Sequence, residues 1–248
     1  MAKDTFLDKL WQSAPAGERN FRPDDVTHLP EAVKLYLEHA IAPGTELSSA
    51  VWLRMHGEIK LKRWVLFKAE QVINRGRGMV WSASVRMYGI PVRGFDRLVD
   101  GEGEMRWKLL GLIPIIRASG PDITRSVAGR VAAELIWLPS MLCDREVEWE
   151  AEDASHARAL ISISGHASNI RLTVRNSGRL DSISVQRWGN PGGAEFHLAD
   201  FGGVVEQEDP FSGYTVPSRL RVGWYFGTDK FEEEGEFFRV TIHEATFR

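Results

Sequence analysis

The chain has 248 residues, of which 43% are hydrophobic and 26% are charged, and its formal net charge at pH 7 is −3. This length fits one large β-rich domain, and the composition is that of an ordinary globular protein with a sizeable core. The slightly acidic balance argues against nucleic-acid binding, because that function needs a concentrated basic face. The single cysteine, Cys143, excludes an internal disulfide and a cysteine-based zinc site, and we interpret it as a small buried hydrophobe.

Residues 1–45 are predicted to form helices and loops. Asp4–Gln12 reads as a short amphipathic helix, and Ala32–Ile41 reads as a second helix that Pro30 opens. The first residues lack an apolar stretch of signal length, and no apolar run is long enough to span a membrane. We therefore expect a soluble, cytoplasmic protein.

Alternation of apolar and polar residues predicts a first strand meander over residues 50–117. The clearest strand is Val51–Leu61, in which Trp52 stands on the otherwise polar side. Further strands are expected at 64–73, 79–87, 92–99 and 105–109. The triplet Gly101-Glu102-Gly103 fits a hairpin turn, since glycine adopts positive φ at little cost.

A strong helix, placed at 121–139 within a segment 121–141, is predicted to interrupt the strands. Pro121 opens this helix and Pro139 closes it. A second meander is expected over residues 145–248, with strands at 147–151, 157–163, 170–174, 180–188, 219–226 and 237–247.

The ten to twelve strands counted in this way predict a single domain, residues 1–248, of the mostly-β (α+β) class. A sheet of this size must curl, close or split. We expect a large curved antiparallel sheet or half-barrel, with the N-terminal helical segment and the inserted helix covering its concave side.

Several stretches of the chain resemble an uncharacterised bacterial protein family of unknown function, from about Leu29 to Phe247. They are Leu29-Pro30, Trp81, Pro91–Gly94, Asp96–Gly103, Gly111–Pro114, Arg130 with Glu134–Pro139, Gln186–Asn190, Phe201–Gly203, Gly213-Tyr214 and Pro217–Trp224. This resemblance implies no activity. The order of elements also resembles the half-barrels of periplasmic lipoprotein carriers (Lol-type), as do Gly178–Leu180 and the spacing of Tyr214, Pro217 and Leu220. That likeness implies a hollow that holds acyl chains.

Arg130, Glu134 and Trp137 are the first candidate site residues, because their spacing puts them on one face of the inserted helix. Arg130 could there meet the carboxylate or phosphate of a ligand. The alternative is an ordinary i,i+4 ion pair beside a core tryptophan. Asp96 belongs to a charged stretch that could do acid–base work or hold a hard cation, and the alternative there is a solvated hairpin.

Nine tryptophans are many for this length, and several could line a cavity rather than only fill a broad core. The predicted lining residues are Trp52, Met55, Trp81, Trp107 and Trp224.

The sequence contains no G-x-S-x-G elbow, P-loop or H-E-x-x-H motif, and none of its seven histidines has metal-binding spacing. We predict no metal and no cofactor. The first hypothesis is a non-enzymatic binder of an apolar or amphipathic small molecule such as a lipid or acyl group. The second is an enzyme for a hydrophobic substrate, with Asp96, Arg130 and Glu134 converging in the pocket. The third is an interaction protein without a ligand.

Overall fold

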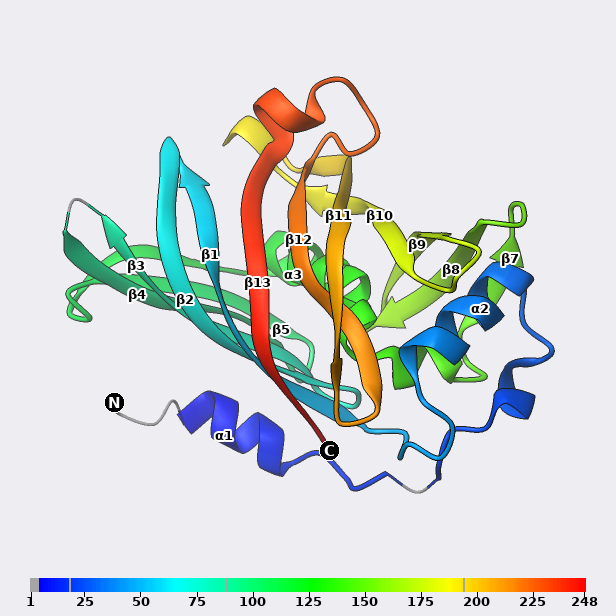
Figure 1. Ribbon diagram of the computed structural model, residues 1–248. Helices are drawn as coiled ribbons and strands as arrows, with labels where there is room; N and C mark the ends of the chain where they lie inside the picture. The colour runs from blue at the N-terminus through cyan, green and yellow to red at the C-terminus, as the bar shows by residue number, and fades with distance from the viewer. Residues whose placement is uncertain (1–4, 18, 88, 194) are drawn as a thin grey trace.

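The chain forms one open, curved sheet of 13 antiparallel strands, seen in a computed structural model (Figure 1). The structure describes residues 5–17, 19–87, 89–193 and 195–248, so Asp4 of the expected first helix lies outside the described residues. The predicted fold class, a mostly-β protein with a large curved antiparallel sheet and one helix inserted in mid-chain, is confirmed.

The first meander holds β1 (Ala50–Leu61), β2 (Arg63–Asn74), β3 (Gly78–Met87), β4 (Ile90–Val99), β5 (Glu102–Leu109) and β6 (Ile113–Ser119). The second holds β7 (Glu148–Ala151), β8 (His156–Ile163), β9 (His166–Val174), β10 (Leu180–Gly189), β11 (His197–Phe211), β12 (Tyr214–Trp224) and β13 (Glu236–Phe247). The helices are α1 (Thr5–Gln12), α2 (Glu31–Ala40) and α3 (Pro121–Glu134). The short helical turns are η1 (Pro23–Val26), η2 (Leu135–Trp137), η3 (Pro139–Cys143), η4 (Pro191–Gly193) and η5 (Phe231–Gly235).

The two meanders are joined where the first strand pairs with the last one. β1 and β13 are hydrogen-bonded along their length, from Val51 opposite Phe247 to Ile59 opposite Phe238. Within each meander, consecutive strands are neighbours, so every other pairing is a local hairpin. The sheet does not close, because β6 and β7 remain as its two edges.

Helix α3 lies inside the curve of the sheet and contacts strands of both meanders (Figure 1). We call the face of the sheet that α3 covers the inner face. The α-helix ends at Glu134, earlier than expected, and continues as η2 and η3. Pro139 is the reason, because the residue before a proline is driven out of the α conformation, and Leu138 has φ −133° and ψ 65°.

The two N-terminal helices lie on different sides of the sheet. Helix α2 packs against β8, β9 and β12, and its apolar side joins the main core. Helix α1 packs on the opposite, outer face, where Leu7 and Leu10 form a small cluster with Val72 and Val80. The sheet is therefore buried on both faces at β2 and β3, which explains apolar residues on both sides of these strands.

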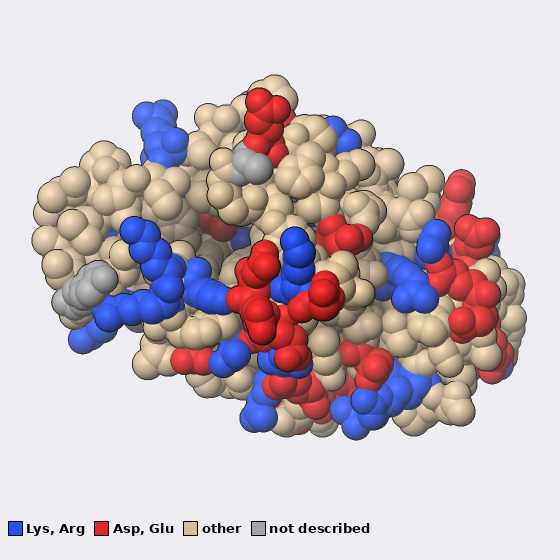
Figure 2. Space-filling model, turned by 90° about the horizontal axis from the view of Figure 1, so that it is seen from above, with Lys and Arg blue, Asp and Glu red and all other residues tan. Residues whose placement is uncertain are grey.

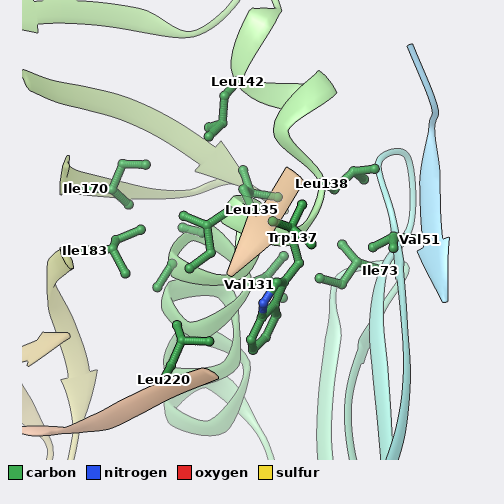
Figure 3. Packing of buried hydrophobic residues seen from close by; sticks show 14 of the residues in the cluster. Val51, Ile73, Val131, Leu135, Trp137, Leu138, Leu142, Ile170, Ile183 and Leu220 are labelled. Carbon is green, nitrogen blue, oxygen red and sulfur yellow. The ribbon is translucent and has the colours of Figure 1, made fainter. Parts of the chain in front are cut away.

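The middle of the inner side is filled by side chains. Figure 3 shows Val131, Leu135, Trp137 and Leu138 between residues of the first meander, such as Ile73, and residues of the second. All of these side chains are buried. A ligand cavity through the centre of the domain is thus excluded by this packing.

Two strands, β6 and β11, are absent from the sequence-based assignment. β6 reads Ile-Pro-Ile-Ile and does not alternate, because as an edge strand it is exposed to solvent and needs no buried face. β11 contains Gly202, Gly203 and Pro210, which are poor strand residues. The expected turn at Gly101-Glu102-Gly103 is shifted: the turn residues are Asp100 and Gly101, both with positive φ, and Glu102 begins β5.

The Tyr214 hydroxyl fastens the loop before β1 to β12. It donates to the Glu46 carbonyl (2.6 Å) and accepts from the Ser48 amide (2.9 Å), and its ring stacks on Phe247 at 4.1 Å. We expect Tyr214→Phe to lower the free energy of unfolding by about 1–3 kcal/mol, because two backbone groups lose their buried partner. Urea unfolding measures this effect.

The matched control is Tyr225→Phe, because Tyr225 is only half-buried. An equal loss in the two variants would show that the hydroxyl of Tyr214 has no special role.

Candidate functional site

Arg130 on α3 is the centre of a charged cluster on the inner face. Its Nε donates to Glu134 Oε1 at 2.7 Å, and its Nη1 donates to Asp96 Oδ2 of β4 at 3.1 Å. Trp107 Nε1 donates to Asp96 Oδ1 at 3.1 Å, and Gln71 Nε2 donates to Glu134 Oε2 at 2.5 Å. The structure therefore brings Asp96, Arg130 and Glu134 together, and their convergence in a ligand pocket stays a prediction.

Burial dominates the electrostatics of Asp96. Loss of solvation raises the pKa of this carboxyl, although the Arg130 guanidinium and the Trp107 indole act in the opposite direction. Each of the three ionic side chains is no more than 14% exposed. Removing one partner of such a buried ion pair leaves the other charge uncompensated, which destabilises the folded state.

Arg187 on β10 places a second, half-buried guanidinium beside this cluster. Its Nε donates to the Ser126 carbonyl of α3 at 3.0 Å, and its charge lies over the rings of Phe201 (4.6 Å) and Trp224 (5.1 Å). Within the described part of the chain, no Asp or Glu forms an ion pair with Arg187, and its Nη1 has no hydrogen-bond partner. Burial, and then the nearby Arg130, lowers the pKa of Arg187 to about 9.

Sequence reasoning missed Arg187, although one signal was present. Arg187 follows Ile183 and Val185 at alternate positions of β10, so it occupies an inward position where the pattern expects an apolar residue.

A series of aromatic rings, which we call the aromatic arc, crosses the inner face from β5 to β12. It consists of Trp107, Trp81, Phe67, Phe238, Phe237, Phe201 and Trp224, with successive centroids 4.9–6.5 Å apart. Both arginines contact the rings of the arc. The Arg130 guanidinium lies 5.0 Å from the centroid of the Trp81 ring, and the Arg187 guanidinium lies against the Phe201 and Trp224 rings. Both meanders contribute to it, so the arc spans the β1–β13 junction.

Two glycines allow the end rings of the arc to lie flat on the sheet. A Cβ at Gly94 would come within 2.4 Å of the Trp107 ring, and a Cβ at Gly189 would come within 2.2 Å of the Trp224 ring. Glycine is needed at both places for close approach. The rings are thus positioned by the backbone as well as by neighbouring side chains.

A recess opens at the upper end of the domain. Figure 2 looks down on this end and shows a recess between the part formed by the first meander and the centre of the molecule, with charged atoms at its floor. Trp107, Phe237, Phe238 and Trp224 are only half-buried. These four rings therefore keep part of their surface exposed to solvent, in contrast to the packed centre of the domain.

The other predicted site residues lie elsewhere. Met55 is buried in the core on the inner face. Trp52 faces α1 on the outer face, where it meets Trp11 at 5.9 Å and donates to Glu70 at 3.0 Å. Trp137 belongs to η2 rather than α3 and donates to the Pro217 carbonyl at 2.9 Å, so it points away from the face of Arg130 and Glu134. The early end of the helix separates them.

A separate pocket of about 300 Å³ lies at the opposite end of the domain. The residues that line it include apolar ones, such as Ile73, Leu135 and Ile163, and the two arginines Arg75 and Arg77. Both arginines already pair with carboxylates, of Asp144 and Asp100 respectively. None of the site residues predicted from the sequence lines this pocket.

Among the described residues, no group of three or more His, Cys, Asp or Glu side chains is placed to hold a metal ion. Nor does any described helix combine the length and apolar character needed to cross a membrane.

Comparison with known proteins places the chain in a family. Residues 19–233 match DUF6544, a family of unknown function. The chain belongs to this family. The expected resemblance to an uncharacterised family is thereby confirmed. No curated protein matches the sequence.

Two solved structures are similar to the chain. One is a putative outer membrane lipoprotein-sorting protein domain from Vibrio parahaemolyticus, with 8% identity, a TM-score of 0.43, and coverage of 81% of this chain and 86% of that one. The other is a LolA superfamily protein from Nitrosomonas europaea, with 9% identity, a TM-score of 0.42, and coverage of 88% and 92%.

The charged cluster makes a stability prediction. We expect Arg130→Met to lower the free energy of unfolding by about 3–5 kcal/mol at neutral pH, because Asp96 and Glu134 would stay buried without their cation. The control is Arg54→Met, whose ion pair with Glu244 is 49% exposed on both sides and should matter by less than about 1 kcal/mol.

The defect should also depend on pH. A buried carboxyl with a raised pKa binds its proton more tightly in the folded state than in the unfolded state, so its unfavourable effect disappears as the pH falls through that pKa. Urea unfolding from neutral to acidic pH should thus show the Arg130→Met deficit shrinking. A deficit that is constant with pH would contradict the role assigned to the carboxylates.

Proposed function

We propose that this protein binds a small amphipathic molecule, with an acidic head group at Arg187 and an apolar part against the aromatic arc. The observation that carries the proposal is the Arg187 guanidinium. It lies against the Phe201 and Trp224 rings and has no ion-pair partner among the described residues. An arginine fork can donate two parallel hydrogen bonds to a carboxylate or phosphate.

Arg130 is less suited to hold the head group than the sequence suggested. Its two carboxylate partners already occupy it, whereas Arg187 keeps Nη1 donors free of partners within the described residues. With all four groups ionised, the cluster of Asp96, Glu134, Arg130 and Arg187 has no net charge. Arg187 thus has the negative charges of Asp96 and Glu134 in its vicinity, but no carboxylate accepts a hydrogen bond from it among the described residues.

The aromatic arc suits the apolar part of such a ligand. Four of its rings are only half-buried, and they present apolar surface beside the charged groups of Arg130 and Arg187. Small-molecule sites commonly combine apolar and aromatic walls with a small number of placed polar groups.

The convergence of Asp96 and Glu134 also bears on the enzyme hypothesis. All four carboxylate oxygens, however, accept hydrogen bonds, from Trp107, Arg130 and Gln71. Either carboxyl would have to leave a partner before it could exchange a proton with a substrate. Binding is therefore the function that this geometry favours.

The location of the protein in the cytoplasm stays a prediction.

Native mass spectrometry of the purified protein, followed by organic extraction, would identify a ligand that remains bound. Titration with laurate and with dodecanol then separates the head group from the tail, because the two probes share their chain length. We expect laurate to bind more tightly than dodecanol. Equal affinities would contradict an acidic head-group site.

Arg187→Gln should weaken laurate binding by about 10-fold or more and leave dodecanol binding unchanged, since a hydrogen bond to a charged group contributes about 1.5–3 kcal/mol. The matched control is Arg75→Gln, in the lining of the 300 Å³ pocket. If Arg75→Gln alone weakened laurate binding, the ligand would lie in that pocket and the proposal would be wrong.

Stability distinguishes this role from a structural one. Burial lowers the pKa of Arg187 to about 9, so the folded state holds this proton less tightly than the unfolded state, and the cation opposes folding at neutral pH. That opposition is relieved as the pH rises through about 9. We therefore expect Arg187→Gln to keep or raise the free energy of unfolding at pH 7, in contrast to Arg130→Met, because the substitution removes this cation.

A further inference from the structure

The exposed apolar side chains of this protein are concentrated in three stretches of the first meander, residues 59–68, 85–95 and 105–119. These stretches hold eight of the eleven large hydrophobic side chains that are exposed among the described residues. Leu112 is 79% exposed, Leu66 is 73% exposed, and Leu110 and Ile113 are each 56% exposed. Scattered exposed apolar residues are ordinary, but a cluster of this kind marks an interaction surface.

The fold brings the three stretches to one end of the sheet. They contain the β1–β2, β3–β4 and β5–β6 turns, as the pairs Leu61–Arg63, Met87–Ile90 and Leu109–Ile113 show. In an antiparallel meander, alternate turns lie at the same end. Figure 1 shows these strand ends gathered on the side of the first meander away from α2. We call this region the basic apolar end.

The charged residues within the three stretches all have one sign, although Arg106 pairs with Glu104 and Lys60 contacts Glu233 of η5, both of which lie outside the stretches. The three stretches contain nine Lys and Arg residues and no Asp or Glu, although the whole chain has a net charge of −3. Figure 2 shows the same separation, because the part of the molecule formed by the first meander carries many blue and few red atoms. Long basic side chains beside exposed leucine and isoleucine can keep their charges in water while the apolar groups enter another phase.

We propose that the basic apolar end docks on the surface of an anionic lipid bilayer. The exposed tips would enter the boundary between head groups and acyl chains, and Lys62, Arg86 and Lys108 would meet the anionic head groups. Charge complementarity selects this occupant, because anionic membranes attract juxtaposed basic residues. This inference goes beyond the ligand site and does not depend on it.

A second copy of the chain is the competing occupant, since β6 is an open sheet edge. Two copies meeting through the same surface would, however, bring like charges together, which opposes association. The exposed residues also extend over three hairpins, well beyond the edge strand itself.

Sedimentation of the full chain with vesicles tests the proposal. We expect binding to vesicles of phosphatidylcholine with phosphatidylglycerol, little binding to phosphatidylcholine alone, and weaker binding as salt is raised. Absence of binding to the mixed vesicles, or equal binding to both kinds, would overturn the proposal.

Two double variants identify the surface. Lys62→Gln with Lys108→Gln should weaken binding about 30-fold, given about 1 kcal/mol for each basic residue near an anionic membrane. Leu112→Ser with Ile113→Ser should weaken it by about 10-fold or more, because both side chains would lose their place in the interface. Lys62, Leu112 and Ile113 are exposed and Lys108 is half-buried near the end of β5, and circular dichroism would check that the variants keep their fold.

The matched controls are Lys9→Gln with Arg145→Gln, and Leu160→Ser with Leu198→Ser, all exposed residues away from these turns. Controls that weaken binding as much as the test variants would overturn the assignment of the surface. Sedimentation equilibrium measures whether the chain forms a dimer. If the parent chain were a dimer that did not bind vesicles, and Leu112→Ser with Ile113→Ser made it a monomer, the surface would belong to an interface with a second copy.

Discussion

The packing of α3 inside the curve of the sheet is the contact on which the rest of the structure depends. A sheet of 13 strands cannot leave its inner face in water, and α3 with its extension η2 covers the middle of that face for both meanders. Its apolar residues fill the centre, while Arg130 and Glu134 face the strands of the first meander. One short helix thus supplies both the core and the charged cluster.

The polar side of this contact restricts how α3 can sit. Arg130 reaches Asp96 on β4, and Glu134 reaches Gln71 on β2, so a shift of the helix along its axis would leave charges unpaired in a buried region. Apolar packing alone tolerates more than one arrangement. The cluster therefore adds specificity to a contact whose strength comes mainly from the core, and it holds the helix where Ser126 meets Arg187.

The sequence was most informative where one face of a strand is buried and the other is wet. Val51–Leu61 alternates because β1 separates core from surface, and its place in the structure agrees with that pattern. β6 and β11 have no such signal, one because it is an exposed edge and the other because glycines admit neighbouring rings such as Phe226. Periodicity along a helix also brought Arg130 and Glu134 together correctly.

Other features of the site depend on contacts that no local pattern contains. Trp137 has the helical spacing from Arg130 and Glu134 that would put all three on one face. The α-helix ends at Glu134, however, because Pro139 follows, so Trp137 lies in a 3-10 turn and points elsewhere. The side on which Trp52 lies was ambiguous until α1 was placed against it. Arg187 was hidden because its importance comes from the rings of β11 and β12, which are distant in sequence.

The position of β13 has a consequence for synthesis of the protein. The C-terminal strand, only 12 residues long, lies between β1 and β12 in the interior of the sheet. Until β13 has emerged from the ribosome, its neighbours β1 and β12 must both wait as open edges. Unpaired strand edges are prone to join other chains. A nascent chain of this protein is therefore exposed to misassembly at these two edges until β13 has emerged, and a truncation that removes β13 would leave it in that state permanently.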